Sequence, residues 1–123
     1  MILKIYSYND KELCYKLAFI SGSEEWLRWH PLGLLRKKNK TFYLLEDDNG
    51  KLIGFCSRNN KGYIADVHIL EEFRGKGFGE KLLFSVLEKG NTLATMNPFM
   101  MKISEKAGMK PYKKKGRFLH YKL

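Results

Sequence analysis

The sequence predicts an α+β domain with a mixed, mostly antiparallel sheet of about seven strands flanked by about four helices. Three observations lead to this class. The run Asp48–Gly50 separates two apolar, strand-like segments, and Asn-Gly is a strong hairpin signal. The glycine-rich segment "EFRGKGFG" at 72–79 stands between a strand-like and a helix-like run. Asn97 followed by Pro98 supplies an N-cap residue and a proline at the first helical position, which predicts a helix start.

The first half of the chain is expected to contain a strand, two helices and three further strands. Residues 2–8 ("ILKIYSY") predict the first strand, and Asn9 with Glu12 resembles a capping box at the start of a helix. A second helix is expected from Ser23 until Pro31. After the basic loop "RKKNK", three antiparallel strands are expected at 41–47, 51–58 and 63–70.

The second half alternates helices and strands. Apolar residues from Phe78 to Leu87 recur on one helical face, and Gly90 is placed to end that helix. A short strand is expected at 91–96, then a helix from Pro98 that Gly108 terminates. The remaining residues predict two strands that turn near Gly116. With no repeat, linker or low-complexity segment, residues 1–123 are expected to form a single domain.

Composition and charge limit the classes of protein to which this chain can belong. The 123 residues are 44% hydrophobic and carry a net charge of +10, which favours polyanionic partners such as nucleic acid, an acidic surface or a phosphorylated cofactor. Cys14 and Cys56 form no CxxC pair, so neither a disulfide framework nor a metal site is expected, and reduced thiols favour the cytoplasm. The N-terminal apolar run is broken by Lys4, so neither a signal peptide nor a membrane span is expected.

The glycine segment predicts an anion site. Its glycines stand at 75, 77 and 79, a spacing that fits neither the dinucleotide fingerprint nor the Walker loop. The pattern R-x-x-G-x-G lies instead between an antiparallel strand and a helix N-terminus. Bare backbone lets several N–H groups converge on one anion there, and Arg74 and Lys76 add positive charge. A pyrophosphate suits such a loop, and the alternative is a glycine-rich turn with solvated cations.

The run "YIADVHILEEFRGKGFGEKLL" at 63–83 resembles the central motif of the GNAT superfamily of acyl-CoA-dependent N-acyltransferases. The resemblance implies a GNAT-like fold and acetyl transfer from acetyl-CoA to a primary amine. It implies that the pantetheine arm pairs with the backbone of Val67, His68 and Ile69. It also places Asn97 at the second cofactor motif and Lys106 near the nucleotide phosphates. The residues it implies for the pyrophosphate are Arg74, Gly75, Lys76, Gly77, Phe78 and Gly79.

The sequence indicates the catalytic residues less clearly than the cofactor-binding residues. Ser104 stands where the family commonly has a tyrosine that protonates the leaving thiolate, and Ala65 and Tyr63 occupy positions where relatives often have a base. Asp66 and His68 are the candidate proton acceptors, and each has a structural alternative as a turn or packing residue.

The candidate proton donors are Ser104 and Tyr112, of which a tyrosine has the more suitable pKa. Cys56 is expected to be a small core residue, and direct transfer in a ternary complex needs no acyl-enzyme. Trp26, Trp29 and His30 either cover the acceptor cleft or pack in the core.

Two other functions remain open from the sequence. One is a CoA-binding module that has lost transferase activity. The other is a basic protein that acts on nucleic-acid-linked substrates, for which no recognition motif is present. The partners expected are therefore acetyl-CoA and an unidentified amine, with no membrane, in a monomer or a homodimer.

Overall fold

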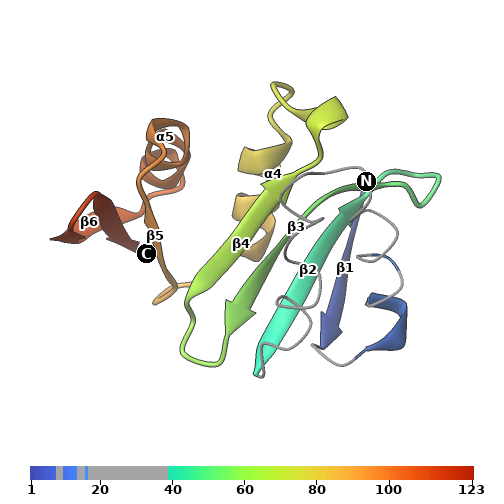
Figure 1. The fold of residues 1–123 in the computed structure, drawn as a ribbon, viewed down its shortest axis with the longest axis horizontal. Coiled ribbons are helices and arrows are strands. Elements are labelled where there is room, and N and C mark those ends of the chain that lie inside the picture. Colours follow the sequence, from blue (N-terminus) through green and yellow to red (C-terminus); the bar gives the residue numbers. More distant parts are fainter. Residues whose placement is uncertain (8–9, 14–15, 17–38) are drawn as a thin grey trace.

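A four-stranded antiparallel sheet forms the larger layer of the protein (Figure 1). The computed structural model describes residues 1–7, 10–13, 16 and 39–123. Strands β1 (Ile2–Ser7), β2 (Lys40–Glu46), β3 (Leu52–Asn59) and β4 (Ile64–Ile69) lie in the order β1-β2-β3-β4. Each strand pairs antiparallel with its neighbour, as expected for a meander.

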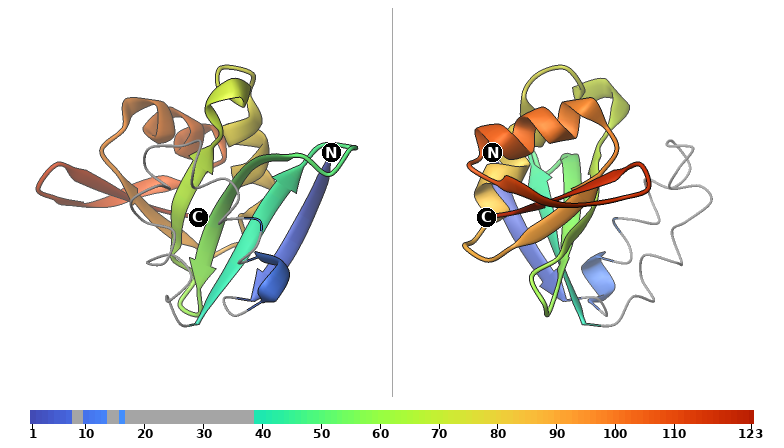
Figure 2. Two further views of the ribbon diagram at one scale, coloured as in Figure 1. Left: turned by 45° about the vertical axis from the view of Figure 1, so that its right-hand side comes forward. Right: turned by 90° about the vertical axis from the view of Figure 1, so that its left-hand side faces the viewer.

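A second, three-stranded sheet contains the C-terminal half. Strands β5 (Thr92–Thr95), β7 (Phe118–Lys122) and β6 (Lys110–Lys115) lie in the order β5-β7-β6, all antiparallel. Within the described residues, one parallel bridge between Tyr63 and Thr92 joins the two sheets. The β6–β7 hairpin projects away from the four-stranded sheet (Figure 2).

The described helices lie between these strands in sequence. The 3₁₀ turn η1 (Glu71–Phe73) precedes the glycine loop, α4 (Phe78–Val86) follows it, and α5 (Pro98–Lys106) follows β5. Residues 11–13 are also helical, and the Asp10 carboxylate accepts hydrogen bonds from the backbone N–H groups of Glu12 at 2.9 Å and Leu13 at 3.4 Å. Asp10 therefore caps this first helical turn.

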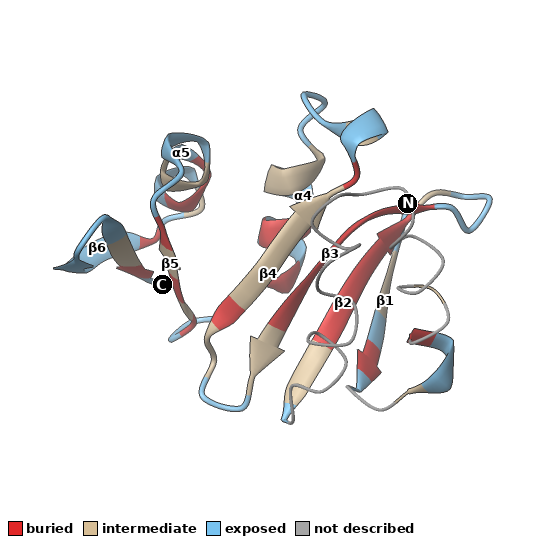
Figure 3. Cartoon of the chain, viewed as in Figure 1, coloured by how far each residue is buried: buried red, intermediate tan, exposed pale blue. Residues whose placement is uncertain are grey.

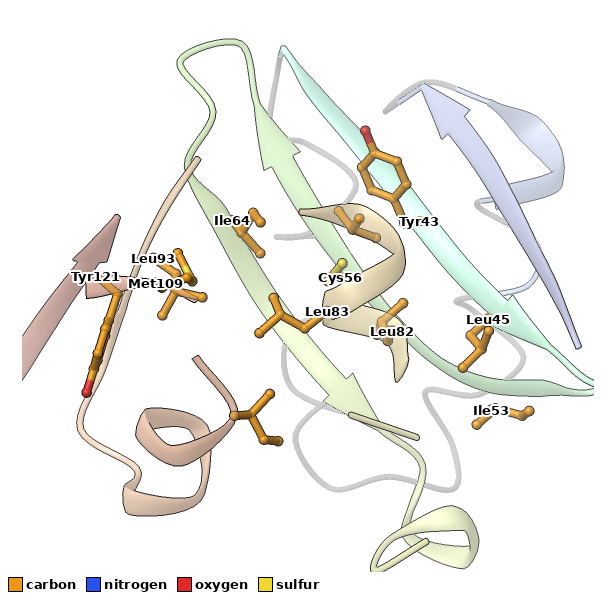
Figure 4. Packing of buried hydrophobic residues seen from close by; sticks show 12 residues of the cluster. Tyr43, Leu45, Ile53, Cys56, Ile64, Leu82, Leu83, Leu93, Met109 and Tyr121 are labelled. Carbon is orange, nitrogen blue, oxygen red and sulfur yellow. The ribbon is translucent and has the colours of Figure 1, made fainter. Parts of the chain in front are cut away.

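The buried core residues form two clusters on opposite faces of the larger sheet. Most of β2 and β3, between the two clusters, is buried (Figure 3). Alternation along β2 explains the division, because Tyr43 and Leu45 face one side while Phe42 and Leu44 face the other. The first cluster connects α4 with the smaller sheet through Leu82, Leu83, Val86, Leu93, Ile103 and Tyr121, several of which Figure 4 shows. The second cluster contains Tyr6, Leu13, Phe42, Leu44, Leu52, Phe55 and Leu70.

The predicted fold class is confirmed, and the described elements follow the predicted order, with one difference. Among the described residues, seven strands form two sheets joined by a single bridge instead of one continuous sheet. In the β2–β3 turn, Gly50 has a φ of 79°, and the Asp47 carboxylate accepts from the N–H groups of Asn49 (2.8 Å) and Lys51 (2.9 Å). The predicted hairpin is thus present, and the Asp47 side chain anchors its turn.

Several sequence predictions lie outside the described residues, namely those for Asn9, Cys14, the helix from Ser23 to Pro31, Trp26, Trp29 and His30. In the part of the chain that the structure describes, no helix has the length and apolar character needed to cross a membrane. The same residues contain no group of three or more His, Cys, Asp or Glu side chains that could hold a metal ion.

Candidate active site

The widest part of the site is a cavity of about 450 Å³ between the end of β4, the glycine loop and the start of α5, called the main cavity below. It collects nearly all of the residues predicted to bind the cofactor; Lys76 and Lys106 are the exceptions. Its lining residues are Val67, His68, Ile69, Phe73, Arg74, Gly75, Gly77, Phe78, Gly79, Asn97, Phe99, Met100 and Ile103.

The glycine loop leaves its backbone open. Gly75 and Gly77 have φ angles of 77° and 82°, which favour glycine, and a Cβ built at either would meet no atom within 4 Å. The Arg74 side chain lies back on β4, where its Nε donates to the Ile69 carbonyl oxygen at 2.8 Å. The rings of Phe73 and Phe78 meet edge to face, 5.9 Å between centroids, and both residues line the main cavity.

The N-terminus of α4 carries no side-chain cap. Gly77 is the N-cap residue, in the left-handed conformation, and it has no side chain to accept from the first N–H groups of the helix. These groups, together with the positive end of the helix dipole, lie beside the main cavity. The loop therefore fits a diphosphate, which would satisfy the uncapped N–H groups.

The two other predicted cations lie differently. Lys106 on α5 forms an ion pair with Glu80 on α4, with 2.9 Å between Nζ and Oε1, so its charge ties the two helices together. Lys76 is exposed at the tip of the loop and does not line the main cavity.

A second cavity of about 300 Å³ continues along the line where the two sheets diverge. Val67, Asn97 and Met100 line both this second cavity and the main cavity. Its other walls are Tyr63–Asp66 on the β4 side and Leu93–Thr95 on β5. The two cavities together follow the edge of β4 that faces β5.

A bulge in β4 shapes this edge. Phe55 pairs with His68 and Ser57 pairs with Ala65, so two residues of β4, Asp66 and Val67, stand opposite one residue of β3. Asp66 has a φ of 56°, which is uncommon for a residue with a side chain. The bulge thus overlaps, at Val67, the start of the backbone predicted to pair with pantetheine.

The Asp66 carboxylate is held by two partners across the sheet. Its Oδ2 accepts from the Ser57 hydroxyl at 2.7 Å and from the Lys40 ammonium at 3.0 Å. The Lys40 and Asp66 side chains are only 13% and 9% exposed, so the pair is well shielded from solvent. This arrangement anchors the bulge to β2 and β3.

His68 lies on the same face of the sheet as these groups. Its ring packs on Phe55, 5.6 Å between centroids, and Phe55 and Ser57 are two residues apart on β3. His68 also lines the main cavity, whereas Asp66 lines the second cavity.

Neither of the two candidate acids lines either cavity. Ser104 is fully buried in α5, and its hydroxyl donates to the Met100 carbonyl oxygen at 2.7 Å. Tyr112 lies on β6, is 55% exposed, and its ring contacts that of His120.

Cys56 is confirmed as a core residue. Its side chain is fully buried in the first cluster, and burial raises the pKa of its thiol to about 12. A thiol that stays protonated makes a poor nucleophile.

Sequence reasoning missed two residues that shape the site. Lys40 was seen only as the end of a basic loop, and no signal linked it to Asp66, 26 positions away. Gly54 pairs with Ile69, and a Cβ there would lie 2.6 Å from the His68 carbonyl oxygen. A glycine within an apolar strand was the available signal for this close approach.

Comparison with known proteins identifies one family. The model of the acetyltransferase (GNAT) family matches residues 5–100. No curated protein matches the sequence significantly.

The solved structures that it resembles share the fold at low identity. A variant of the spermidine N-acetyltransferase SpeG from Vibrio cholerae has a TM-score of 0.68 at 16% identity, over 98% of this chain and 93% of that one. The N-acetyltransferase PseH from Campylobacter jejuni, in complex with acetyl coenzyme A, has a TM-score of 0.65 at 12% identity, over 99% and 98%. PH1933 from Pyrococcus horikoshii OT3 has a TM-score of 0.65 at 21% identity, over 98% and 96%.

The chain therefore belongs to the GNAT acetyltransferase family. As a member of this family it is an acetyl-CoA-dependent N-acetyltransferase.

Proposed function

We propose that the protein transfers acetyl from acetyl-CoA directly to a primary amine while both are bound. The main cavity carries this proposal, because it brings together an uncapped helix N-terminus, an open glycine loop and the bulged edge of β4. Acetyl-CoA supplies an activated thioester; the protein has to bind it, orient it and manage one proton.

Binding is assigned to backbone groups. The N–H groups from Gly75 to Gly79 hold the pyrophosphate, whereas the Arg74 N–H donates to the Glu71 carbonyl oxygen at 3.2 Å. Each charge-assisted hydrogen bond contributes about 1.5–3 kcal/mol. The backbone of Val67–Ile69 orients the pantetheine arm as a neighbouring strand would, since the edge of β4 has no strand partner there among the described residues. Asn97, which caps α5 by accepting from Phe99 N–H at 2.9 Å, fixes the opposite wall.

The acceptor must lose a proton before it attacks. A lysine-like amine with a pKa near 10.4 costs about 4–5 kcal/mol to neutralise at pH 7. Transfer forms a C–N bond, breaks a C–S bond and moves one proton from the nitrogen toward the departing sulfur. We assign the proton acceptor to His68, because it lines the main cavity.

Asp66 is assigned a positioning role, because Lys40 and Ser57 already occupy its carboxylate. We assign no acid to Ser104 or Tyr112, since neither lines the two cavities, and a thiolate can leave without a dedicated donor. The buried, protonated Cys56 supports direct transfer without an acyl-enzyme.

The acceptor is proposed to be other than a free polyamine. Spermidine, named for one structural neighbour, is a polycation, and a protein with a net charge of +10 repels polycations.

The cytoplasm is proposed as the location, because the described Cys56 is a free thiol.

The test combines calorimetry with kinetics. Acetyl-CoA is expected to bind more tightly than ATP and to keep binding at moderate salt, and the Gly77→Glu variant is expected to lose that binding because it places a carboxylate in the anion site. With an aliphatic amine as acceptor, initial rates should give intersecting double-reciprocal lines, which indicate a ternary complex. Parallel lines would contradict direct transfer, and acetyl-CoA binding without release of thiol from any amine would indicate a lapsed enzyme.

A further inference from the structure

The β5-β7-β6 sheet has a strongly basic outer face. Tyr121 and Leu93 pair across β7 and β5 and lie in the core, so their neighbours in sequence point to the opposite side. Two cross-strand rows follow from the register: Thr92–Lys122–Lys110 and Ala94–His120–Lys113, with Phe118 paired to Lys115 beyond them. This set is called the outer face below.

The charge on this face is not balanced by the protein. Residues 109–123 include no Asp or Glu, and none of the four lysines of the outer face forms an ion pair within the described residues. Lys110 stands directly opposite Lys122, an arrangement that destabilises a strand pair. An external polyanion would relieve this repulsion.

Aromatic rings stand among these lysines. Phe118 is 45% exposed, and Tyr112, the extra residue of a bulge in β6, is 55% exposed with its ring 6.1 Å from that of His120. Cations that follow a phosphate backbone, together with exposed rings on which bases stack, are the features that bind single-stranded nucleic acid. An acidic peptide would use the lysines but would have no use for the rings.

The outer face leads to the site. Ala94, in the row with His120 and Lys113, lines the second cavity. The hairpin also projects from the protein, so an extended strand can reach the face without obstruction from the larger sheet (Figure 2).

We propose that the outer face binds single-stranded nucleic acid, with RNA as the probe, through the phosphate contacts of Lys110, Lys113, Lys115 and Lys122 and stacking on Phe118. Bound there, the strand brings an amine attached to it toward the second cavity, a consequence that rests on the proposed function. Four phosphate contacts predict that log K falls with log salt at a slope of about −3.

Fluorescence anisotropy with a labelled oligouridylate, between about 50 and 200 mM salt, tests the proposal. The Lys113→Gln/Lys115→Gln variant is expected to bind about tenfold more weakly, with a slope shallower by about 1.4. The matched control is Lys11→Gln/Lys81→Gln, which removes the same charge from exposed sites outside the outer face and should bind like the parent. Phe118→Ala is expected to weaken binding about tenfold with little change in slope.

Three results would overturn the proposal. The first is no binding of the oligouridylate at the lowest salt, and the second is an equal loss of affinity in both double variants. The third is displacement of the oligouridylate by polyglutamate at an equal concentration of negative charges. The last would assign the face to acidic peptides. Calorimetry with acetyl-CoA on the same variants separates this outcome from failure of the proposed function, because the anion site in the glycine loop does not use these lysines.

Discussion

Replacing Gly77 by alanine separates binding from stability at the glycine loop. Gly77 has a φ of 82°, and a left-handed conformation costs a residue with a Cβ about 1–2 kcal/mol. Alanine also restricts the unfolded chain, which offsets about 0.4–1 kcal/mol. Because the Cβ meets no atom within 4 Å, no steric cost is added. We expect a net loss of about 1 kcal/mol, or about 4 °C in Tm.

The effect on acetyl-CoA binding should be larger than the effect on folding. The new methyl group would project from the loop at the place assigned to the pyrophosphate. Loss of a single charge-assisted hydrogen bond, about 1.5 kcal/mol at least, predicts binding weaker by about tenfold or more. Calorimetry measures this affinity, and thermal melting measures the stability of the same samples.

Gly90→Ala is the matched control. Gly90 has a φ of 92°, a Cβ there also meets nothing within 4 Å, and the residue lines neither cavity. It should lose a similar amount of stability and keep its affinity for acetyl-CoA. The reasoning fails if Gly77→Ala binds acetyl-CoA as tightly as the parent, or if both variants lose affinity equally.

Three further predictions concern the residues behind the site. Because the Cys56 pKa rises from 9.0 to about 12 on folding, the unfolded chain binds fewer protons than the folded chain above pH 9. The free energy of unfolding should therefore fall by about 1.4 kcal/mol per pH unit above pH 9. Denaturant titrations of Cys56→Ala should show a shallower fall over the same pH range. Leu83→Ala, at a fully buried core position, should cost about 2–5 kcal/mol in the same titrations, and a loss under about 1 kcal/mol would mean that the site repacks. Lys40→Met leaves the shielded Asp66 carboxylate without its cation, so we expect about 2–3 kcal/mol of destabilisation and severalfold weaker acetyl-CoA binding. Lys40→Arg should restore both the stability and the affinity. Unchanged affinity in Lys40→Met would show that the bulge does not depend on this ion pair.

Local signals in the sequence accounted for most of the fold. Asn97 was predicted to cap α5, and its side chain does accept from Phe99 N–H. The turn at Gly116 and the helix after the glycine loop were likewise determined by residues close together in the sequence. Because most of the predicted cofactor residues are contiguous, the structure gathers them in the main cavity.

The remaining features depend on contacts between distant residues. Asp66 adopts a positive φ without a glycine to mark it, because Lys40 and Ser57 hold its carboxylate from neighbouring strands. Ser104 was a candidate proton donor because of its position in the sequence. Its hydroxyl instead donates to the Met100 carbonyl oxygen within α5, and this contact becomes visible only in the folded helix. The division into two sheets depends on how β4 and β5 diverge beyond a single bridge, which no local pattern records.

The open edge of β4 has a consequence for how much folded protein a cell maintains. An unpaired strand edge is a template for self-association, and among the described residues β4 pairs with β3 alone. If acetyl-CoA lies along that edge, it acts as a protective cap as well as a substrate. At a concentration of about one hundred times Kd it would add about 2.7 kcal/mol to stability. The abundance of this enzyme should therefore follow the supply of its own acyl donor.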